Sequence, residues 1–174
     1  MGDNILIGLR TSRRLFLKGL AVSSAAVGIG TTITGCSYER APEGLLFLDE
    51  KGYAVIRAFA DRVVPRGGPF PEGALDTGVV EFFDAFAAAS YPEVRKDLKS
   101  AITVLEHGPI VLAMKAKRFT QMTASEQDDY LTLMQNSASA MIRGLFVGFK
   151  RVCFMGFYVN EKVWPSIGYD GPWV

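Results

Sequence analysis

The feature that most constrains the fold is the helical spacing of apolar residues between clear start and stop signals. After Asp49, a candidate N-cap, apolar side chains recur every three or four positions until Pro65 ends the run. Thr123 and Glu126 have the spacing of a capping box, which predicts another helix start. No run alternates between apolar and polar residues as a half-buried strand does. The sequence therefore predicts an all-α fold, a small irregular helical bundle with an irregular, aromatic-rich C-terminal tail.

The remaining elements are predicted from proline positions and apolar periodicity. Pro92 suits the first position of a helix because a helix leaves its first N–H groups unpaired. The sequence His107-Gly108-Pro109 is expected to break that helix, with a further helical run to about Arg118. The other expected elements are a loop over residues 65–75, a helix capped by Asp76 or Thr77, and a last helix from about Ala138 to Phe157.

The first 35 residues resemble a twin-arginine signal peptide. A weakly apolar stretch over residues 19–34 follows the basic segment and is short for a bilayer-spanning helix. The twin-arginine pathway carries folded proteins, so this segment predicts export through the twin-arginine translocase. The alternative is an ordinary basic amphipathic N-terminus. The residues that fall at consensus positions are Arg13, Arg14, Phe16, Leu17 and Lys18.

The signal ends in a sequence that resembles a lipobox, Ile33-Thr34-Gly35-Cys36. Acylation of the Cys36 thiol would hold the protein on a membrane surface without a spanning helix. The alternative is a plain signal end with a cysteine there by chance. Residues 36–48 are then a tether and residues 49–174 the helical domain, located in the periplasm or anchored to the membrane and facing the periplasm.

Composition excludes several classes of function. The whole chain has 19 basic and 18 acidic side chains, of which four basic and one acidic precede Cys36. The part from Cys36 onward therefore has 15 basic and 17 acidic side chains. It lacks the basic excess that a nucleic-acid-binding protein needs. Two cysteines and one histidine are too few for a disulfide framework, a four-ligand zinc site, an iron–sulfur cluster or covalent haem. We expect neither a metal nor a cofactor in this chain.

Few residues are candidates for catalysis. His107 is predicted to be a helix-end residue because Gly108 and Pro109 follow it, and the lack of a second histidine weakens a metal or triad role. Asp61 and Asp84 have the residue type of an acid–base pair. We expect them instead on solvated helix faces or as helix-end partners of arginines such as Arg57 and Arg62. Cys153 lies among apolar residues and is predicted to be a buried, inert thiol.

The C-terminal stretch combines large aromatic residues with glycine and proline, which favour irregular backbone. Such side chains bury either against the chain's own helices or against a partner, where tryptophan and tyrosine are favoured anchors. Both alternatives remain open from the sequence. The candidate partner-interface residues are Tyr158, Trp164, Tyr169 and Trp173.

Several short blocks together resemble the gluconate 2-dehydrogenase subunit 3 family. They are the Arg13-Arg14 signal, the Asp-x-x-x-Pro of residues 60–65, the Pro-x-Gly-Ala and Gly-Val of residues 71–79, the aspartate of residues 82–84, and the closing Gly-Tyr-x-Gly-Pro of residues 164–172. The resemblance covers nearly the whole chain. It implies a non-catalytic gamma subunit that carries the export signal for a large flavoprotein and supports its folding.

The resemblance also implies the partners. The large subunit would be similar to glucose-methanol-choline oxidoreductases and hold FAD, and a cytochrome c subunit with haem c could take the electrons. Two other hypotheses remain. One is a free-standing envelope lipoprotein that acts as a binding module through Cys36. The other is an enzyme that uses Asp61, Asp84 or His107.

Overall fold

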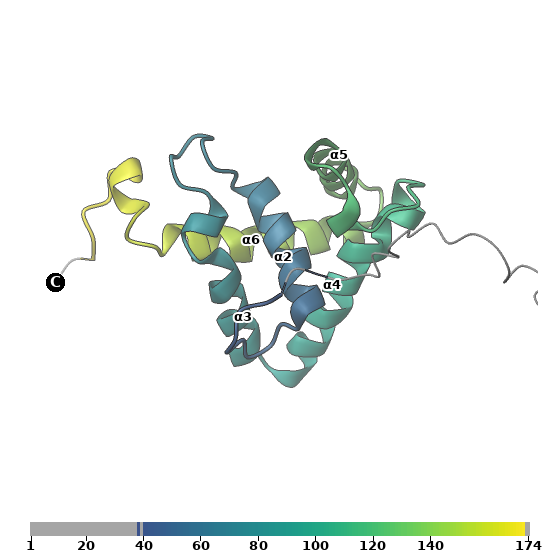
Figure 1. Ribbon diagram of the computed structural model, residues 1–174, viewed down its shortest axis with the longest axis horizontal. Helices are drawn as coiled ribbons and strands as arrows, with labels where there is room; N and C mark the ends of the chain where they lie inside the picture. Colours follow the sequence, from purple (N-terminus) through teal and green to yellow (C-terminus); the bar gives the residue numbers. More distant parts are fainter. Residues whose placement is uncertain (1–37, 39, 173–174) are drawn as a thin grey trace, which may run out of the picture. The chain divides into compact units, whose positions relative to one another are not determined.

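The computed structural model describes residues 38 and 40–172 of the 174-residue chain. This part of the chain contains helices and no strand, so the all-α prediction is confirmed (Figure 1). The α-helices are α2 (Glu50–Val63), α3 (Val79–Ala89), α4 (Pro92–Leu112), α5 (Ala124–Gln135) and α6 (Ala140–Tyr158). Three short 3-10 turns accompany them: η1 (Ala74–Asp76), η2 (Phe119–Gln121) and η3 (Trp164–Ile167).

Helix α2 is the centre of the core and packs against all four other helices. Its apolar residues fall on one face, as the sequence predicted, and Ile56 and Phe59 are fully buried there. Asp49 caps the helix by accepting the backbone N–H of Gly52 at 2.7 Å. In Figure 1, α2 runs between α3 and α4, and α6 crosses the three.

Helix α6 supplies the aromatic part of the core. The rings of Phe149 and Phe59 meet at a centroid distance of 5.7 Å. Gly156 allows α6 to approach α3 closely, because a Cβ at this position would lie 2.9 Å from Cδ1 of Phe82. The last helix was predicted over about 138–157, and it runs two residues later at its start and one at its end.

The second helix starts later than its predicted caps. It begins at Val79, and the predicted caps stabilise the preceding loop instead. The Asp76 carboxylate accepts the N–H of Gly73 at 2.9 Å and pairs with Arg66, and these bonds lower the pKa of Asp76 to about 2. The Thr77 hydroxyl donates to the Gly73 carbonyl at 3.1 Å. Local side-chain bonds to the loop therefore replaced the expected helix cap.

The prediction of a break at His107-Gly108-Pro109 is wrong. Helix α4 continues through these residues to Leu112, and Pro109 lies in its last turn. Tertiary packing explains the difference. The Tyr130 hydroxyl from α5 occupies the space that a side chain at position 108 would need, and Pro109 itself is buried. The expected helical run to Arg118 is also wrong, since the chain there is irregular before η2.

The capping box of α5 is confirmed. The backbone N–H of Glu126 donates to Thr123 Oγ1 at 3.3 Å, and the N–H of Thr123 donates to Glu126 Oε2 at 3.0 Å. Glu126 also pairs with Lys117 at 3.0 Å and Lys115 at 3.3 Å. The Thr123 N–H and the two lysines lower the pKa of Glu126 to about 2.

Candidate functional site

The three side chains considered for catalysis lie on three different helices. Asp61 is half-exposed on α2, and its Oδ2 lies 3.8 Å from Nη1 of Arg62. His107 is on α4, where its Nε2 lies 2.9 Å from Nζ of Lys51. Asp84 is on α3. Within the part of the chain that the structure describes, no hydrogen bond or ion pair joins any two of these three. They do not form an acid–base constellation.

Asp84 is not on a solvated face, and that prediction is wrong. Its side chain is only 3% exposed. Its two oxygens accept the consecutive backbone N–H groups of Leu46, Phe47 and Leu48 at 2.7, 2.9 and 2.7 Å. Oriented backbone amides stabilise a buried anion without a basic side chain. Asp84 therefore fastens the segment before α2 to α3.

A second buried carboxylate, Glu106 on α4, was missed in the sequence. Its Oε1 accepts the hydroxyls of Tyr38 at 3.1 Å and Thr120 at 2.7 Å, and its Oε2 accepts the Thr120 N–H at 3.1 Å. Nε of Arg118 lies 3.7 Å from Oε1, and its guanidinium lies 5.0 Å from the Tyr38 ring centroid. These bonds satisfy the buried charge, so Glu106 joins Tyr38 and η2 to α4.

Cys153 is buried on α6, as predicted. Burial raises the pKa of its thiol to about 12, so the nucleophilic thiolate is scarce at neutral pH. Among the described residues, no group of three or more His, Cys, Asp or Glu could hold a metal ion. No helix in the described part is long and apolar enough to cross a bilayer.

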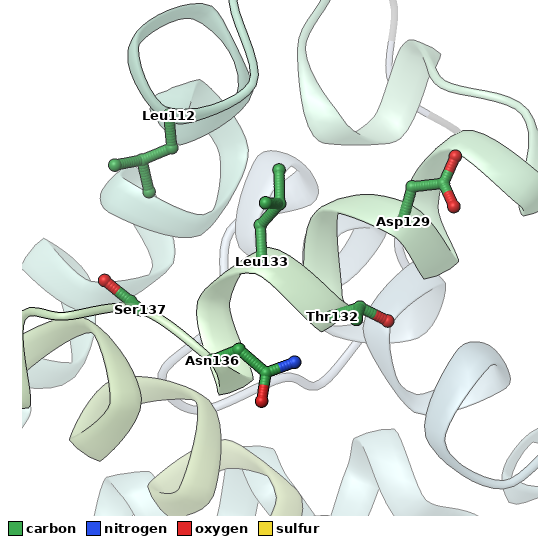
Figure 2. A pocket seen from close by; sticks show the side chains of 6 residues that line it. All are labelled: Leu112, Asp129, Thr132, Leu133, Asn136 and Ser137. Carbon is green, nitrogen blue, oxygen red and sulfur yellow. The ribbon is translucent and has the colours of Figure 1, made fainter.

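None of the main surface hollows in the described part is lined by Asp61, Asp84, Glu106, His107 or Cys153, although Lys51 and Arg62 each line one. Another has a volume of about 540 Å³ and lies between the end of α4 and α5. Figure 2 shows Leu133 pointing from α5 toward the turn that carries Leu112. The one charged residue that lines this hollow is Asp129. Its negative charge would repel the pyrophosphate of a flavin nucleotide.

The outer face of α6 has the composition of a contact surface. Its exposed residues fall in one sector of the helix, and apolar ones predominate. Helix α6 contains no acid, and Arg151 on this face has no partner among the described residues. Ala140 and Arg143 are exposed as well, and Arg143 Nη1 donates to the backbone carbonyl of Ala138 at 3.0 Å. The remaining exposed residues of α6, with Val159 directly after the helix, are Met141, Gly144, Val147, Gly148, Arg151, Met155, Tyr158 and Val159. We call this set the α6 face.

Two glycines on the α6 face have no packing role within the described part of the chain. A Cβ added at Gly144 or Gly148 would meet nothing within 4 Å, unlike one at Gly156. Glycine in an exposed helix interior destabilises the helix by about 0.5–1 kcal/mol relative to alanine. Gly144 and Gly148 therefore leave this apolar surface flat and lower the stability of the helix. No contact within the described part of the chain accounts for that loss of stability.

The C-terminal aromatic residues continue from the end of the α6 face. Trp164 Nε1 donates to the carbonyl of Tyr158 at 3.0 Å, and the rings of Trp164 and Tyr169 meet at 5.1 Å. Asn160 Nδ2 donates to the Thr77 carbonyl at 2.8 Å, which ties this segment to the start of α3. Figure 1 shows the segment, in yellow, beyond the end of α6. The rings pack on one another, while Tyr158 and Tyr169 remain exposed.

Comparison with known proteins decides the family. The sequence model of the family described as "Gluconate 2-dehydrogenase subunit 3" matches residues 50–171. The chain belongs to the gluconate 2-dehydrogenase subunit 3 family. The match spans all five described helices and η3. No curated protein and no solved structure matches the chain.

The blocks that resemble this family have structural roles here. The Asp-x-x-x-Pro block ends α2, and Asp84 in the third block holds the segment before it. In the closing block, Gly168 and Gly171 have φ angles of 66° and 107°, in the left-handed region that favours glycine. These positions shape the C-terminal segment around Trp164.

Some predicted residues lie outside the described part of the chain. They are the export-signal residues Arg13, Arg14, Phe16, Leu17 and Lys18, the lipidation candidate Cys36, and the interface candidate Trp173.

Proposed function

We propose that this chain is the non-catalytic gamma subunit of an FAD-dependent dehydrogenase that oxidises a sugar, sugar acid or alcohol. Its family membership carries the proposal, because the family is described as a subunit of gluconate 2-dehydrogenase. The large partner subunit would hold FAD and perform catalysis, and a cytochrome c subunit with haem c would accept electrons. The gamma subunit would support folding of the flavoprotein.

The bonding of the candidate catalytic groups supports a non-catalytic role. Asp84 and Glu106 are buried carboxylates whose oxygens are occupied by hydrogen bonds within the fold. Asp61 and His107 each face a basic side chain, Arg62 and Lys51. A general acid or base must reach the proton of a substrate, and none of these groups lines one of the hollows described above.

The α6 face and the aromatic residues beyond it are the proposed contact with the flavoprotein. Exposed apolar surface of this extent is costly in water and typical of a protein interface. Tyr158 lies on the face itself, and Trp164 and Tyr169 extend it. Arg151 at its centre favours a partner surface that is apolar with an acidic residue opposite.

The N-terminal signal gives the subunit its second proposed task. A chain that is expected to bind no cofactor gains little from a pathway for folded proteins, unless it travels with a partner that has folded around a cofactor. We infer that the twin-arginine signal exports the complex to the periplasm, where Cys36 anchors it to the membrane.

Co-purification tests the proposal. The chain is tagged at its C-terminus, co-expressed with its neighbouring genes and purified, and the visible spectrum is recorded. The proposal predicts a flavin spectrum and a larger polypeptide in equal amount. A colourless single chain that is stable and monomeric would contradict it and favour the free-standing lipoprotein.

Export is tested in the same strain by replacing the arginine pair. Arg13→Lys with Arg14→Lys is expected to retain both this chain and the flavoprotein in the cytoplasm. Arg10→Lys is the matched control, because it makes the same charge-conserving substitution outside the pair. Normal export of the flavoprotein in the double variant would show that it does not depend on this signal.

A further inference from the structure

The end of α4 carries a second apolar surface, separate from the α6 face. Val111 and Met114 are 75% and 87% exposed, and Ile110 and Leu112 are also exposed. Leu112 lines the 540 Å³ hollow, with Leu133 across it (Figure 2). We call Ile110, Val111, Leu112 and Met114 the α4 tip. Four exposed apolar side chains within five residues are unusual for a surface that stays in water.

The backbone holds the tip outward. Met114 has a φ of 51°, in the left-handed region where glycine is favoured. The N–H groups of Ala113 and Lys115 both donate to the carbonyl of Pro109 at 3.1 Å, which closes the helix end around it. A methionine at a position that favours glycine therefore places a long apolar side chain in the exposed turn, where it is 87% exposed.

The described fold begins at the same end of α4. Tyr38 is bound to Glu106 and Arg118 at 3.1 and 2.6 Å. Glu106 lies one turn before Ile110, about 6 Å along the helix axis. Cys36 precedes Tyr38 by two residues, so an extended chain places its Cα at most about 7 Å from that of Tyr38. A lipid on Cys36 would therefore be attached two residues before a side chain that is bound one helical turn from the α4 tip.

We propose that the α4 tip is the surface that lies on the lipid bilayer when the chain is anchored at Cys36. The proposal rests on the lipobox and not on the dehydrogenase partner. An acyl anchor alone fixes one point, and insertion of the tip beside it orients the domain. The α6 face lies on another helix and would remain available to the flavoprotein.

Charge around the tip favours an apolar contact over an electrostatic one. Lys115 and Lys117 are both paired with Glu126, and Arg118 is beside Glu106. Asp129 is exposed at the rim of the hollow. Because cations and acids balance here, contact with the bilayer should depend little on salt concentration or anionic lipid content.

The test couples the processed chain, beginning at Cys36, to vesicles of phosphatidylcholine and maleimide-phosphatidylethanolamine. The same experiment is repeated with any flavoprotein that co-purifies. The chain has two cysteines, and Cys153 is buried, so coupling is directed to Cys36. Tryptophan reporters are introduced as Met114→Trp on the tip and Met141→Trp on the α6 face. Met141 is 72% exposed, which makes it a matched control.

Lipids brominated in their acyl chains then quench any inserted tryptophan. We expect the Met114→Trp emission to shift to the blue and lose most of its added intensity, at low and high salt alike. The Met141→Trp emission should not be quenched by these lipids. Quenching of Met141→Trp in place of Met114→Trp overturns the proposal. Quenching of neither also overturns it.

A second measurement tests the premise in the cell. Mass spectrometry of the processed N-terminus should find a diacylglyceryl modification on Cys36. An unmodified Cys36 overturns the anchored orientation. Neither result changes the flavin spectrum of the co-purified complex, so failure of this proposal is distinguishable from failure of the proposed function.

Discussion

The carboxylate of Asp84 and the backbone N–H of Leu48 meet at 2.7 Å, although 36 residues separate them in the chain. With the N–H groups of Leu46 and Phe47, this contact fixes the chain segment before α2 on α3. Leu48 is buried as a consequence, while Leu46 stays exposed beside it. The tether predicted from the sequence thus meets the fold at two buried anions, at Asp84 through residues 46–48 and at Glu106 through Tyr38.

Asp84→Asn is expected to lower the free energy of unfolding by about 2–4 kcal/mol, because an amide nitrogen replaces one acceptor and leaves a buried N–H group unpaired. Urea denaturation measures the effect. The control is Asp61→Asn, which changes a half-exposed aspartate and should alter stability by no more than about 0.5 kcal/mol. Equal stability of both variants would show that the three bonds do not stabilise the fold.

Replacing the glycines of the α6 face by alanine should raise the stability of the free chain and lower its affinity for the partner. Gly144→Ala and Gly148→Ala should each stabilise the free chain by about 0.5–1 kcal/mol through helix propensity. Both should weaken binding to the co-purified flavoprotein, because the added methyl groups separate the two surfaces. Thermal unfolding and titration calorimetry measure the two effects.

Gly156→Ala is the matched control on the same helix. Its added Cβ would lie 2.9 Å from Phe82 Cδ1, so we expect a loss of about 1–3 kcal/mol in the free chain. Unchanged partner affinity in the Gly144→Ala and Gly148→Ala variants would exclude the α6 face as the interface.

Local signals in the sequence predicted the elements well where the bonding is local. Asp49 and Gly52 are three residues apart, as are Thr123 and Glu126, so a short motif contains both partners of each cap. The all-α class followed from the same periodicity. The failure at Pro109 has a distant cause, because the α5 residue Tyr130 packs at Gly108 and keeps α4 helical through two residues that disfavour it.

The buried carboxylates could not be predicted in the same way. The partners of Asp84 are 36 to 38 residues away, and Tyr38 is 68 residues from Glu106. A weak signal was present, since Glu106 lies four residues after Ile102 on an otherwise apolar helix face. The α6 face was missed because its glycines become informative only when the surrounding atoms are known.

Stability should fall in acid between about pH 4.5 and 2 because of the α5 capping box. The pKa of Glu126 is lowered from its ordinary 4.5 to about 2, so the unfolded chain binds the proton more readily. The stabilisation is therefore complete above pH 4.5 and is lost as the pH falls toward 2. Glu126→Gln keeps the capping hydrogen bond but removes the charge.

The measurement is the free energy of unfolding against pH for the wild type and Glu126→Gln. The variant should have a shallower slope in this range. Asp76→Asn should remove a separate part of the slope, because the pKa of Asp76 is also lowered to about 2. Identical slopes in the wild type and in Glu126→Gln would contradict the prediction.

The contact between Gly108 and Tyr130 predicts a double-mutant cycle. Alanine is favoured over glycine in a helix, yet Gly108→Ala should cost about 1–3 kcal/mol because its Cβ would collide with the Tyr130 hydroxyl. Tyr130→Phe removes that oxygen, whose hydrogen bond to the Val104 carbonyl is long at 3.5 Å, so alone it should cost about 1 kcal/mol or less. The double variant should then be more stable than Gly108→Ala alone, with a coupling of about 1–2 kcal/mol in urea denaturation. Additive losses would mean that α4 passes through Gly108 and Pro109 for a reason other than this packing.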